Sequence, residues 1–330
     1  MSRYDESDAR IRPGANKARR RTKDRPQHAD AIPGLVVAVD RGRFTVVVEL
    51  GEDTEHPVYA IKARDLGRKG VVVGDRVAVV GDTTGNEGSL ARIVAIEERQ
   101  SLLRRSSDDT EAVERVIVAN AELLLIVQAL ADPPPRVRFI DRCVIAALDA
   151  GIEPVIVLTK QDLGDDSEIR RVYGAFDLPI FTVGPDADLT ELNELLADRV
   201  SVLIGHSGVG KSTLVNRLVP DADRSTGNVN VVTGRGRHTS TSAVALQLPQ
   251  GGWIIDTPGV RSFGLAHVDS SNLLRFFPDL EEGDALCPRA CSHNEAECGL
   301  EAWAEEHGVD PQRLESLRRL INSLQSGDDR

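Results

Sequence analysis

Three short motifs occur in an unusual order in the middle of this chain. Residues 159–162 read T-K-Q-D, residues 205–212 read G-H-S-G-V-G-K-S, and residues 256–259 read D-T-P-G. The second motif fits the phosphate-binding pattern G-x-x-x-x-G-K-[ST], and the third is a D-x-x-G segment. In small G proteins the phosphate loop comes first and the base-reading T/N-K-x-D motif follows. The order found here therefore predicts a circularly permuted GTPase whose D-x-x-G segment leads directly into a C-terminal region.

The glycine-rich motif has the surroundings that a phosphate loop requires. It follows an apolar strand expected at 201–204 and precedes a helix expected at 211–218. Glycines let the backbone bend so that N–H groups point at phosphate oxygens, and the helix N-terminus adds its positive dipole end. Lys211 is expected to reach the β- and γ-phosphates and to act in catalysis, and Ser212 to bind Mg²⁺. The predicted nucleotide contacts of this loop are Gly205, His206, Ser207, Gly208, Val209, Gly210, Lys211, Ser212 and Thr213.

The T-K-Q-D motif decides which base is bound. It follows a strand expected at 154–158, at the carboxyl edge where open α/β sheets bind ligands. Asp162 can accept hydrogen bonds from N1–H and the 2-amino group of guanine, a pattern that adenine does not offer. Thr159, Lys160 and Asp162 are therefore predicted to select GTP, although Thr159 replaces the more common Asn and could weaken a contact with the phosphate loop. The segment 182–184 is the candidate for a second loop beside the base.

The D-x-x-G segment is expected to sense the γ-phosphate. Asp256 would hold Mg²⁺ through water, and the N–H of Gly259 would meet the γ-phosphate. The next residue is Val260, at a position where many G proteins carry a glutamine that orients the attacking water. Because an apolar side chain cannot orient water, intrinsic hydrolysis is expected to be slow.

A polar segment before D-x-x-G is the candidate source of the missing group. Residues 234–241 read G-R-G-R-H-T-S-T and are expected to form a mobile segment that orders over the nucleotide. Thr239 or Thr241 would supply a hydroxyl to Mg²⁺, and His238 could orient or deprotonate the water. In the alternative interpretation, His238 and its neighbouring arginines contact a partner.

Three of the four cysteines lie close together near the C-terminus. Cys287, Cys291, His293 and Cys298 form a Cys-x₃-Cys-x-His-x₄-Cys pattern. Three thiolates and an imidazole complete a tetrahedral Zn²⁺ shell and leave no position for water, so one structural zinc is predicted. Unligated cysteines in a small core are the alternative, and Cys143, in an apolar helix expected at 136–150, is expected to be core.

The pattern of apolar runs predicts three folded parts. Residues 31–100 contain five short β-rich runs, which predict an OB-fold β-barrel. Residues 101–265 alternate strands with helices, which predicts a P-loop α/β GTPase domain. Residues 266–330 carry the Cys/His pattern and an apolar helix stripe at 311–324, and predict a small helical zinc-binding domain. The expected strands are 34–40, 43–49, 58–61, 75–80 and 91–96 in the barrel, and 121–127, 154–158, 179–183, 201–204, 243–248 and 253–255 in the GTPase domain.

The charge of the chain is acidic overall but unevenly distributed. The formal net charge of −12 argues against general nucleic-acid binding. Residues 1–30, by contrast, hold nine Lys or Arg and five Asp or Glu, and are expected to form a disordered basic arm that either neutralises phosphates or only aids solubility. Lys62, Arg64, Arg68 and Lys69 could bring the barrel to a nucleic-acid backbone. With no apolar run of about 18 residues and no secretory signal, a cytoplasmic protein without membrane contact is expected.

The barrel, the permuted motifs and the C-terminal Cys/His pattern together resemble the RsgA (YjeQ) family of GTPases. The family's G-R-H-T-T-T segment matches 236–241 except at Ser240, and its D-[ST]-P-G-V-R segment matches 256–261. Its zinc ligands fall on the four residues named above, although two spacings are each one residue shorter than usual. The resemblance implies a GTPase that binds the 30S ribosomal subunit and its 16S rRNA late in maturation, is activated by the subunit, and leaves after hydrolysis to GDP. A monomer is expected.

Two other functions are compatible with parts of the sequence. A P-loop kinase or ATPase could use the same phosphate loop, but Asp162 argues against an adenine nucleotide. A GTP-regulated switch could bind another RNA or protein without a role in ribosome assembly. Turnover of GTP and ATP, with and without 30S subunits, separates these alternatives.

Overall fold

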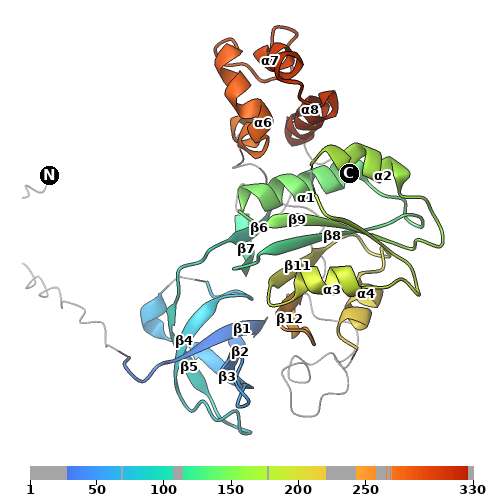
Figure 1. Cartoon of the computed structure of the whole chain (residues 1–330). Helices are drawn as coiled ribbons and strands as arrows, with labels where there is room; N and C mark the ends of the chain where they lie inside the picture. Colours follow the sequence, from blue (N-terminus) through green and yellow to red (C-terminus); the bar gives the residue numbers. More distant parts are fainter. Residues whose placement is uncertain are drawn as a thin grey trace, which may run out of the picture. The chain divides into compact units, whose positions relative to one another are not determined.

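The computed structural model describes residues 28–67, 70–106, 114–176, 178–220, 243–257 and 270–325, together with Leu265 and Val268. The chain divides into two units, Met1–Asp30 and Ala31–Arg330, and the helices and strands in Figure 1 belong to the second. Within the described residues, no helix has the length and apolar character needed to cross a bilayer.

Of the strands that the structure describes, five close into a barrel. Around the barrel they follow the order β1 (Ile32–Asp40), β2 (Arg43–Val48), β3 (His56–Lys62), β5 (Ala91–Ile96) and β4 (Arg76–Gly81), and β4 pairs again with β1. β3 and β5 run parallel, and the other neighbours run antiparallel. Inward-pointing apolar side chains, including that of Phe44, form the barrel core. The predicted five-stranded barrel is confirmed. A short 3₁₀ helix, η2 (Arg64–Leu66), follows β3.

The central sheet is mostly parallel. Its strands follow the order β10 (Ile180–Val183), β9 (Glu153–Thr159), β8 (Leu123–Ala129), β11 (Val200–Ile204), β13 (Trp253–Asp256) and β12 (Val244–Gln247). Only the β12–β13 pair within this group is antiparallel among the described pairings. The predicted alternation of strands and helices between residues 101 and 265 thus gives the expected α/β sheet.

Helices cover both faces of this sheet (Figure 1). Leu124 and Ile126 of β8 pack on the side of α1 (Val137–Asp149) and α2 (Ser167–Tyr173), while Leu123 and Leu125 pack on the side of α3 (Thr190–Leu196) and α4 (Lys211–Leu218). This division follows from the alternation of side chains along a strand. Because both faces are covered, the residues of β8 are apolar on both sides of the strand, with Gln128 as the one polar exception.

Hydrogen bonds join the barrel to the central sheet. Ala38 of β1 pairs with Val244 of β12, so that the two sheets form one eleven-stranded sheet. The side chain of Gln247 also donates a hydrogen bond to Glu55 at 2.8 Å. A separate hairpin, β6 (Leu102–Ser106) and β7 (Glu114–Ala119), lies between barrel and central sheet in the sequence and was not predicted.

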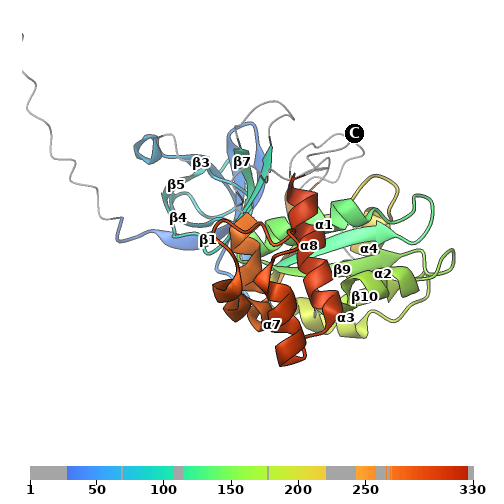
Figure 2. The same cartoon turned by 90° about the horizontal axis from the view of Figure 1, so that it is seen from above.

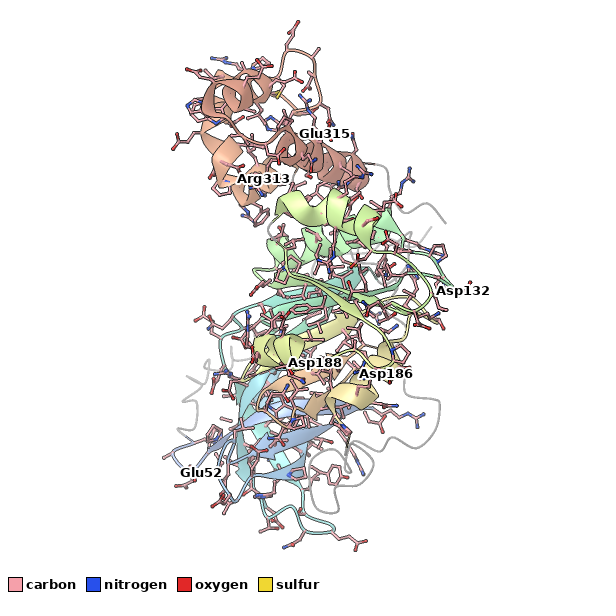
Figure 3. The ribbon with its side chains drawn as sticks, turned by 45° about the vertical axis from the view of Figure 1, so that its right-hand side comes forward. Glu52, Asp132, Asp186, Asp188, Arg313 and Glu315 are labelled. Carbon is pink, nitrogen blue, oxygen red and sulfur yellow. The ribbon has the colours of Figure 1, made fainter. Side chains whose placement is uncertain are left out.

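The C-terminal part is helical. Its described residues form η4 (Ser270–Phe276), α6 (Pro278–Glu281), η5 (Glu282–Leu286), α7 (Gly299–His307) and α8 (Pro311–Gln325). In both views α8 runs beside α1 (Figures 1 and 2). Arg313 of α8, labelled in Figure 3, forms an ion pair with Asp279 and donates a hydrogen bond at 2.6 Å to the carbonyl oxygen of Ala175 in η3 (Gly174–Phe176). The apolar stripe of α8 is therefore a packing surface, with Leu317 and Ile321 fully buried.

Candidate nucleotide and metal sites

The predicted phosphate loop connects β11 to α4 at the carboxyl edge of the central sheet. Gly205 lies so close to β8 that a Cβ there would be 2.3 Å from the carbonyl oxygen of Val127. Gly208 and Gly210 have φ angles of 83° and 86°, in the left-handed region that favours glycine. The three glycines are therefore required by the shape of the loop. The loop ends at the N-terminus of α4, which favours an anion.

Lys211, the first residue of α4, reaches back across the loop. Its ammonium group donates hydrogen bonds to the carbonyl oxygens of Gly205 and His206, the second at 2.9 Å. Partial burial lowers the pKa of Lys211, and the carboxylate of Asp256 opposes that shift. Phosphate oxygens could replace the two carbonyls as partners of this ammonium, since a charged acceptor makes the stronger bond. Ser212 and Thr213 follow on α4 and are exposed.

Thr159, the last residue of β9, connects the base-reading motif to the phosphate loop. Its hydroxyl donates a hydrogen bond to the carbonyl oxygen of Val209 at 2.6 Å. A Cβ on Gly210 would lie 3.2 Å from the same hydroxyl oxygen, so the two loops are in close contact. Threonine in place of asparagine therefore preserves a direct contact between the two motifs.

Lys160 and Asp162 continue from this contact. Lys160 has a φ of 57°, and its ammonium group donates a hydrogen bond to the carbonyl oxygen of Asp132, in the loop that follows β8 (Figure 3). Pro133 in that loop lies 3.8 Å from the position of a Cβ on Gly208. The loop after β8 thus borders both motifs. Asp162 is exposed, which leaves its carboxylate accessible to a base.

The segment 182–184 lies beside the base-reading motif. The N–H of Gln161 donates to the carbonyl oxygen of Val183 at 3.4 Å. A Cβ on Gly184 would lie 3.4 Å from the side chain of Gln161. Arg217 of α4 donates a hydrogen bond to the carbonyl oxygen of Gly184 at 2.7 Å. The candidate for the second base loop is therefore adjacent to the T-K-Q-D motif and held by the helix that follows the phosphate loop.

Asp256 ends β13, next to the strand that leads into the phosphate loop. The parallel register places it opposite Leu203 of β11. The hydroxyl of Thr257 donates a hydrogen bond to the carbonyl oxygen of Leu203 at 2.7 Å, which fixes the end of this strand. This register places Asp256 at the same sheet edge as the phosphate loop, where its carboxylate acts to raise the pKa of Lys211.

The other predicted switch residues lie outside the part of the chain that the structure describes. They are Arg235, Arg237, His238, Thr239, Thr241, Gly259 and Val260. The same applies to Arg68, Lys69 and the basic arm through residue 27. Their roles stay predictions.

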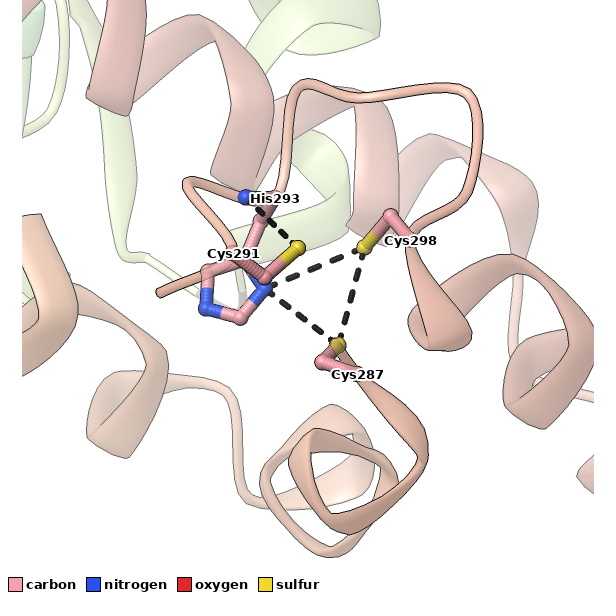
Figure 4. Close-up of side chains that lie close together, drawn as sticks. All are labelled: Cys287, Cys291, His293 and Cys298. Carbon is pink, nitrogen blue, oxygen red and sulfur yellow. Dashed lines mark hydrogen bonds between the residues drawn. The ribbon is translucent and has the colours of Figure 1, made fainter. Parts of the chain in front are cut away.

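The four predicted metal ligands come together between η5 and α7 (Figure 4). One ligand atom from each of Cys287, Cys291, His293 and Cys298 lies within 4.8 Å of the others. The Sγ atom of Cys287 is 3.8 Å from Sγ of Cys298 and 3.7 Å from Nδ1 of His293. Tetrahedral Zn–S bonds of about 2.3 Å place two sulfur atoms about 3.8 Å apart. The donor set and its spacing therefore fit one Zn²⁺ ion.

Neighbouring polar groups hold these ligands. Nε2 of His293 lies 3.9 Å from a carboxylate oxygen of Asp284, on the side of the ring opposite to the other ligands. A carboxylate in this place favours the tautomer that leaves Nδ1 free for a metal. Glu295 accepts hydrogen bonds from the N–H of Ser292, which lower the pKa of its carboxyl to about 2, and it lies 3.3 Å from Sγ of Cys291. The cluster thus has the polar surroundings typical of a structural metal site.

Two contacts near the phosphate loop involve residues that the motifs did not identify. The ring of Phe139 in α1 packs against the ring of His206, with centroids 4.4 Å apart. The side chain of Gln128, buried in β8, accepts a hydrogen bond from the N–H of Arg136 at the start of α1. Gln128 could have been recognised in the sequence as a candidate, because it is a polar residue within an otherwise apolar strand. Nothing in the sequence paired Phe139 with His206.

Known proteins are similar in sequence to most of this chain. Residues 96–266 match the family model described as RsgA GTPase. A protein from Chlorobaculum parvum named small ribosomal subunit biogenesis GTPase RsgA is 35% identical over 309 residues, which cover 89% of this chain and 99% of that protein. A protein of the same name from Pseudomonas syringae pv. tomato is 36% identical over 301 residues, covering 88% of this chain and 85% of that protein.

Two solved structures have a similar fold. The crystal structure of YjeQ from Thermotoga maritima matches 90% of this chain and 99% of its own with a TM-score of 0.65 and 25% identity. The structure of YloQ, described as a circularly permuted GTPase, matches 92% of this chain and 99% of its own with a TM-score of 0.65 and 20% identity. The permuted motifs, the barrel and the sequence matches together show that this chain belongs to the RsgA family of circularly permuted GTPases.

Proposed function

We propose that this chain binds the 30S ribosomal subunit, assists its late maturation, and hydrolyses GTP to GDP with stimulation by the subunit. The names of the relatives support a role in biogenesis of the small subunit. The observation that carries the choice of nucleotide is the hydrogen bond from Thr159 to Val209, because it holds a guanine-reading motif against a phosphate loop. A kinase or ATPase built on the same loop has no use for such a motif.

Different residues at the sheet edge would bind the base and the phosphates of the nucleotide. Asp162 would read the guanine edge, with Thr159 and Lys160 holding its loop, and Lys211 with the N–H groups of residues 205–213 would hold the β- and γ-phosphates. Ser212, Thr241 or Thr239, and Asp256 are the residues that would hold Mg²⁺, directly or through water. When bound with GTP, Mg²⁺ neutralises charge on the β- and γ-phosphates.

Hydrolysis requires a group that orients water. Val260 cannot do this, so we assign the role to His238, whose imidazole can accept a proton or hold the water in line. Gly259 would sense the γ-phosphate through its N–H. Low intrinsic turnover and stimulation by the 30S subunit follow if the subunit places His238 correctly.

The Cys/His cluster would hold one structural zinc. Cys287, Cys291, His293 and Cys298 supply the donor atoms, and no further ligand position is needed for a tetrahedral ion. When bound, the ion contributes folding free energy to a region built of short helices.

Each of the four parts of the chain is assigned its own domain and role. We assign 1–30 as a basic arm, 31–100 as the barrel, 101–265 as the GTPase domain and 266–330 as the metal-binding domain. The arm and the barrel would meet 16S rRNA, and the protein would act as a cytoplasmic monomer. Two basic residues close together in the chain support RNA contact by the barrel: Lys62 at the end of β3 and Arg64 at the start of η2.

The test is turnover of GTP and ATP with and without purified 30S subunits. Hydrolysis of GTP but not ATP, stimulated by 30S and not by 50S subunits, is the expected result. An Asp162→Ala variant is the matched control, since it should lose the preference for GTP while keeping the phosphate loop. GTP turnover that is indifferent to 30S subunits would favour a switch with another partner.

A further inference from the structure

The outer face of the barrel carries an exposed aromatic side chain that neither the nucleotide site nor the metal site uses. Tyr59 of β3 is 45% exposed, and Leu90, directly before β5, is 48% exposed. β3 and β5 are parallel, with Ala60 opposite Ala91. Their register therefore places Tyr59 and Leu90 next to each other on one surface of the sheet.

The alternation of side chains shows which surface this is. Val58 and Ala60, on either side of Tyr59, are buried in the barrel core, so Tyr59 points outward. On β2, Phe44 is in the core and Arg43 is exposed. Tyr59 is therefore available to a partner, whereas the barrel's other aromatic residue is not.

Two arginines border the aromatic side chain. Ile61 pairs with Arg43 of β2 on one side and with Arg92 of β5 on the other. Both arginines are exposed, and no ion pair or hydrogen bond joins either guanidinium to another side chain in the described part of the chain. We call the residues Arg43, Tyr59, Ile61, Leu90 and Arg92 the Tyr59 face.

The Tyr59 face is positive although the protein is acidic. The outward positions of β2, β3 and β5 hold no aspartate or glutamate. The nearest acid by strand register is Asp40 of β1, which is opposite Arg43. Arg92 has no such neighbour in the pairings with β3 and β4, where it faces Ile61 and Val80.

We propose that the Tyr59 face binds an unpaired segment of RNA, with one base stacked on the Tyr59 ring and the flanking phosphates held by Arg92 and Arg43. Aromatic side chains bind bases of any sequence because every base has a π face, and arginines neutralise the phosphates on either side. Barrels of this type bind oligonucleotides on the outer surface of their second and third strands, which is where Tyr59 lies. Two unpaired guanidinium groups disfavour a basic protein as the occupant. The inference rests on the proposed function, because the 30S subunit would supply the RNA.

The first experiment measures the affinity of the full chain for a single-stranded oligouridylate of about ten nucleotides. Tyr59→Ala should weaken binding by about 5- to 150-fold, which corresponds to the loss of one stacked base. Tyr59→Phe should stay within about twofold of wild type because the ring is retained. Leu50→Ala is the matched control, since Leu50 is 43% exposed on the barrel but lies in the turn after β2.

The salt dependence of the same binding tests the arginines. Arg92→Gln should reduce the slope of log affinity against log salt by about 0.7, as expected when one phosphate contact to a single strand is lost. Equal affinities of wild type and Tyr59→Ala would overturn the proposal. So would a Tyr59→Phe variant as weak as Tyr59→Ala, since stacking does not need the hydroxyl.

A crosslinking experiment on 30S subunits identifies the occupant. Leu90→p-benzoylphenylalanine should crosslink to 16S rRNA, and a crosslink to a ribosomal protein instead would overturn the proposal. GTP turnover of the same samples separates the two hypotheses. Loss of stimulation by 30S subunits in the wild type would reject the proposed function, whereas normal stimulation with unchanged oligouridylate binding in Tyr59→Ala would reject the Tyr59 face alone.

Discussion

Arg319 of α8 donates a hydrogen bond from Nε to Oδ1 of Asp141, a carboxylate buried in α1, at 3.2 Å. Tyr173 donates to the same oxygen at 2.8 Å, and the guanidinium carbon of Arg319 lies 4.8 Å from the centre of the Tyr173 ring. Burial raises the pKa of Asp141, and the charge of Arg319 opposes that shift. A charge pair between a buried carboxylate and a partly exposed guanidinium thus attaches α8 to the GTPase core.

Arg319→Met should lower the free energy of unfolding by about 3 kcal/mol, because it leaves a buried carboxylate without its counter-charge. Urea unfolding followed by circular dichroism measures the change. Adding Asp141→Asn to this variant should restore part of the loss, since a neutral amide is less costly to bury than an unpaired carboxylate. A single variant as stable as wild type would show that the pair contributes nothing.

This pair also shows where prediction from sequence stops. The helix expected at 211–218 and the strand expected at 91–96 have the observed limits, because local apolar spacing and turn residues define them. Asp141 and Arg319 are separated by 178 positions, and neither carries a local signal for the other. Their pairing depends on how α8 packs against α1, which no short-range pattern encodes.

The candidate sites also contain features that the local sequence predicts and features that depend on contacts between distant residues. The metal cluster could be predicted because its ligands lie within one short segment, and the phosphate loop because its glycines follow a fixed spacing. For Thr159 only a weakened contact with the phosphate loop was expected, and its direct hydrogen bond to Val209, 50 positions away, could not be predicted from either motif. The exposure of Tyr59 required knowing which face of β3 is covered, which depends on closure of the barrel.

Cys291→Ala should release the metal and unfold the C-terminal helices, because structural zinc contributes folding free energy directly. Metal content by mass spectrometry and helicity by circular dichroism are the measurements. Cys143→Ala is the matched control, since Cys143 is buried in α1 and lies outside the cluster. Full metal content in Cys291→Ala would refute the four-ligand assignment.

The barrel should lose stability as the pH rises through neutrality. Both ring nitrogens of His56 lie 2.7 Å from backbone carbonyl oxygens, of Thr54 and Thr83. The bond to Thr54, then that to Thr83, raise the pKa of His56 above 6.5, and Glu49 adds to this while burial opposes it. A raised pKa in the folded state means that His56 contributes stability below about pH 6.5, which is lost as the pH passes its folded pKa.

Unfolding by urea at several pH values between about 5.5 and 8.5 tests this effect of His56. His56→Gln should have a flatter dependence on pH than wild type, because the glutamine does not titrate. Parallel curves for the two proteins would exclude His56 as the source. The comparison removes contributions from the other histidines, which are present in both.

Thr159→Ala should weaken GTP binding by about tenfold, since it removes one hydrogen bond between the base-reading motif and the phosphate loop. Displacement of a fluorescent GDP analogue measures the affinity. Thr159→Asn should bind GTP as well as wild type does, because the amide can donate to the same carbonyl of Val209. If the alanine variant kept full affinity, the two loops would hold their positions without this bond.

His238→Ala should keep its affinity for GTP and lose at least about 100-fold of the turnover stimulated by 30S subunits, the range of a group that orients or deprotonates water. His238→Gln distinguishes the two roles, because a glutamine can orient water but cannot take its proton at neutral pH. Recovery of turnover in the glutamine variant would assign His238 to orientation. Stimulated turnover that is unchanged in the alanine variant, measured as phosphate release at saturating GTP, would mean that His238 contacts the partner and that water is oriented by another group.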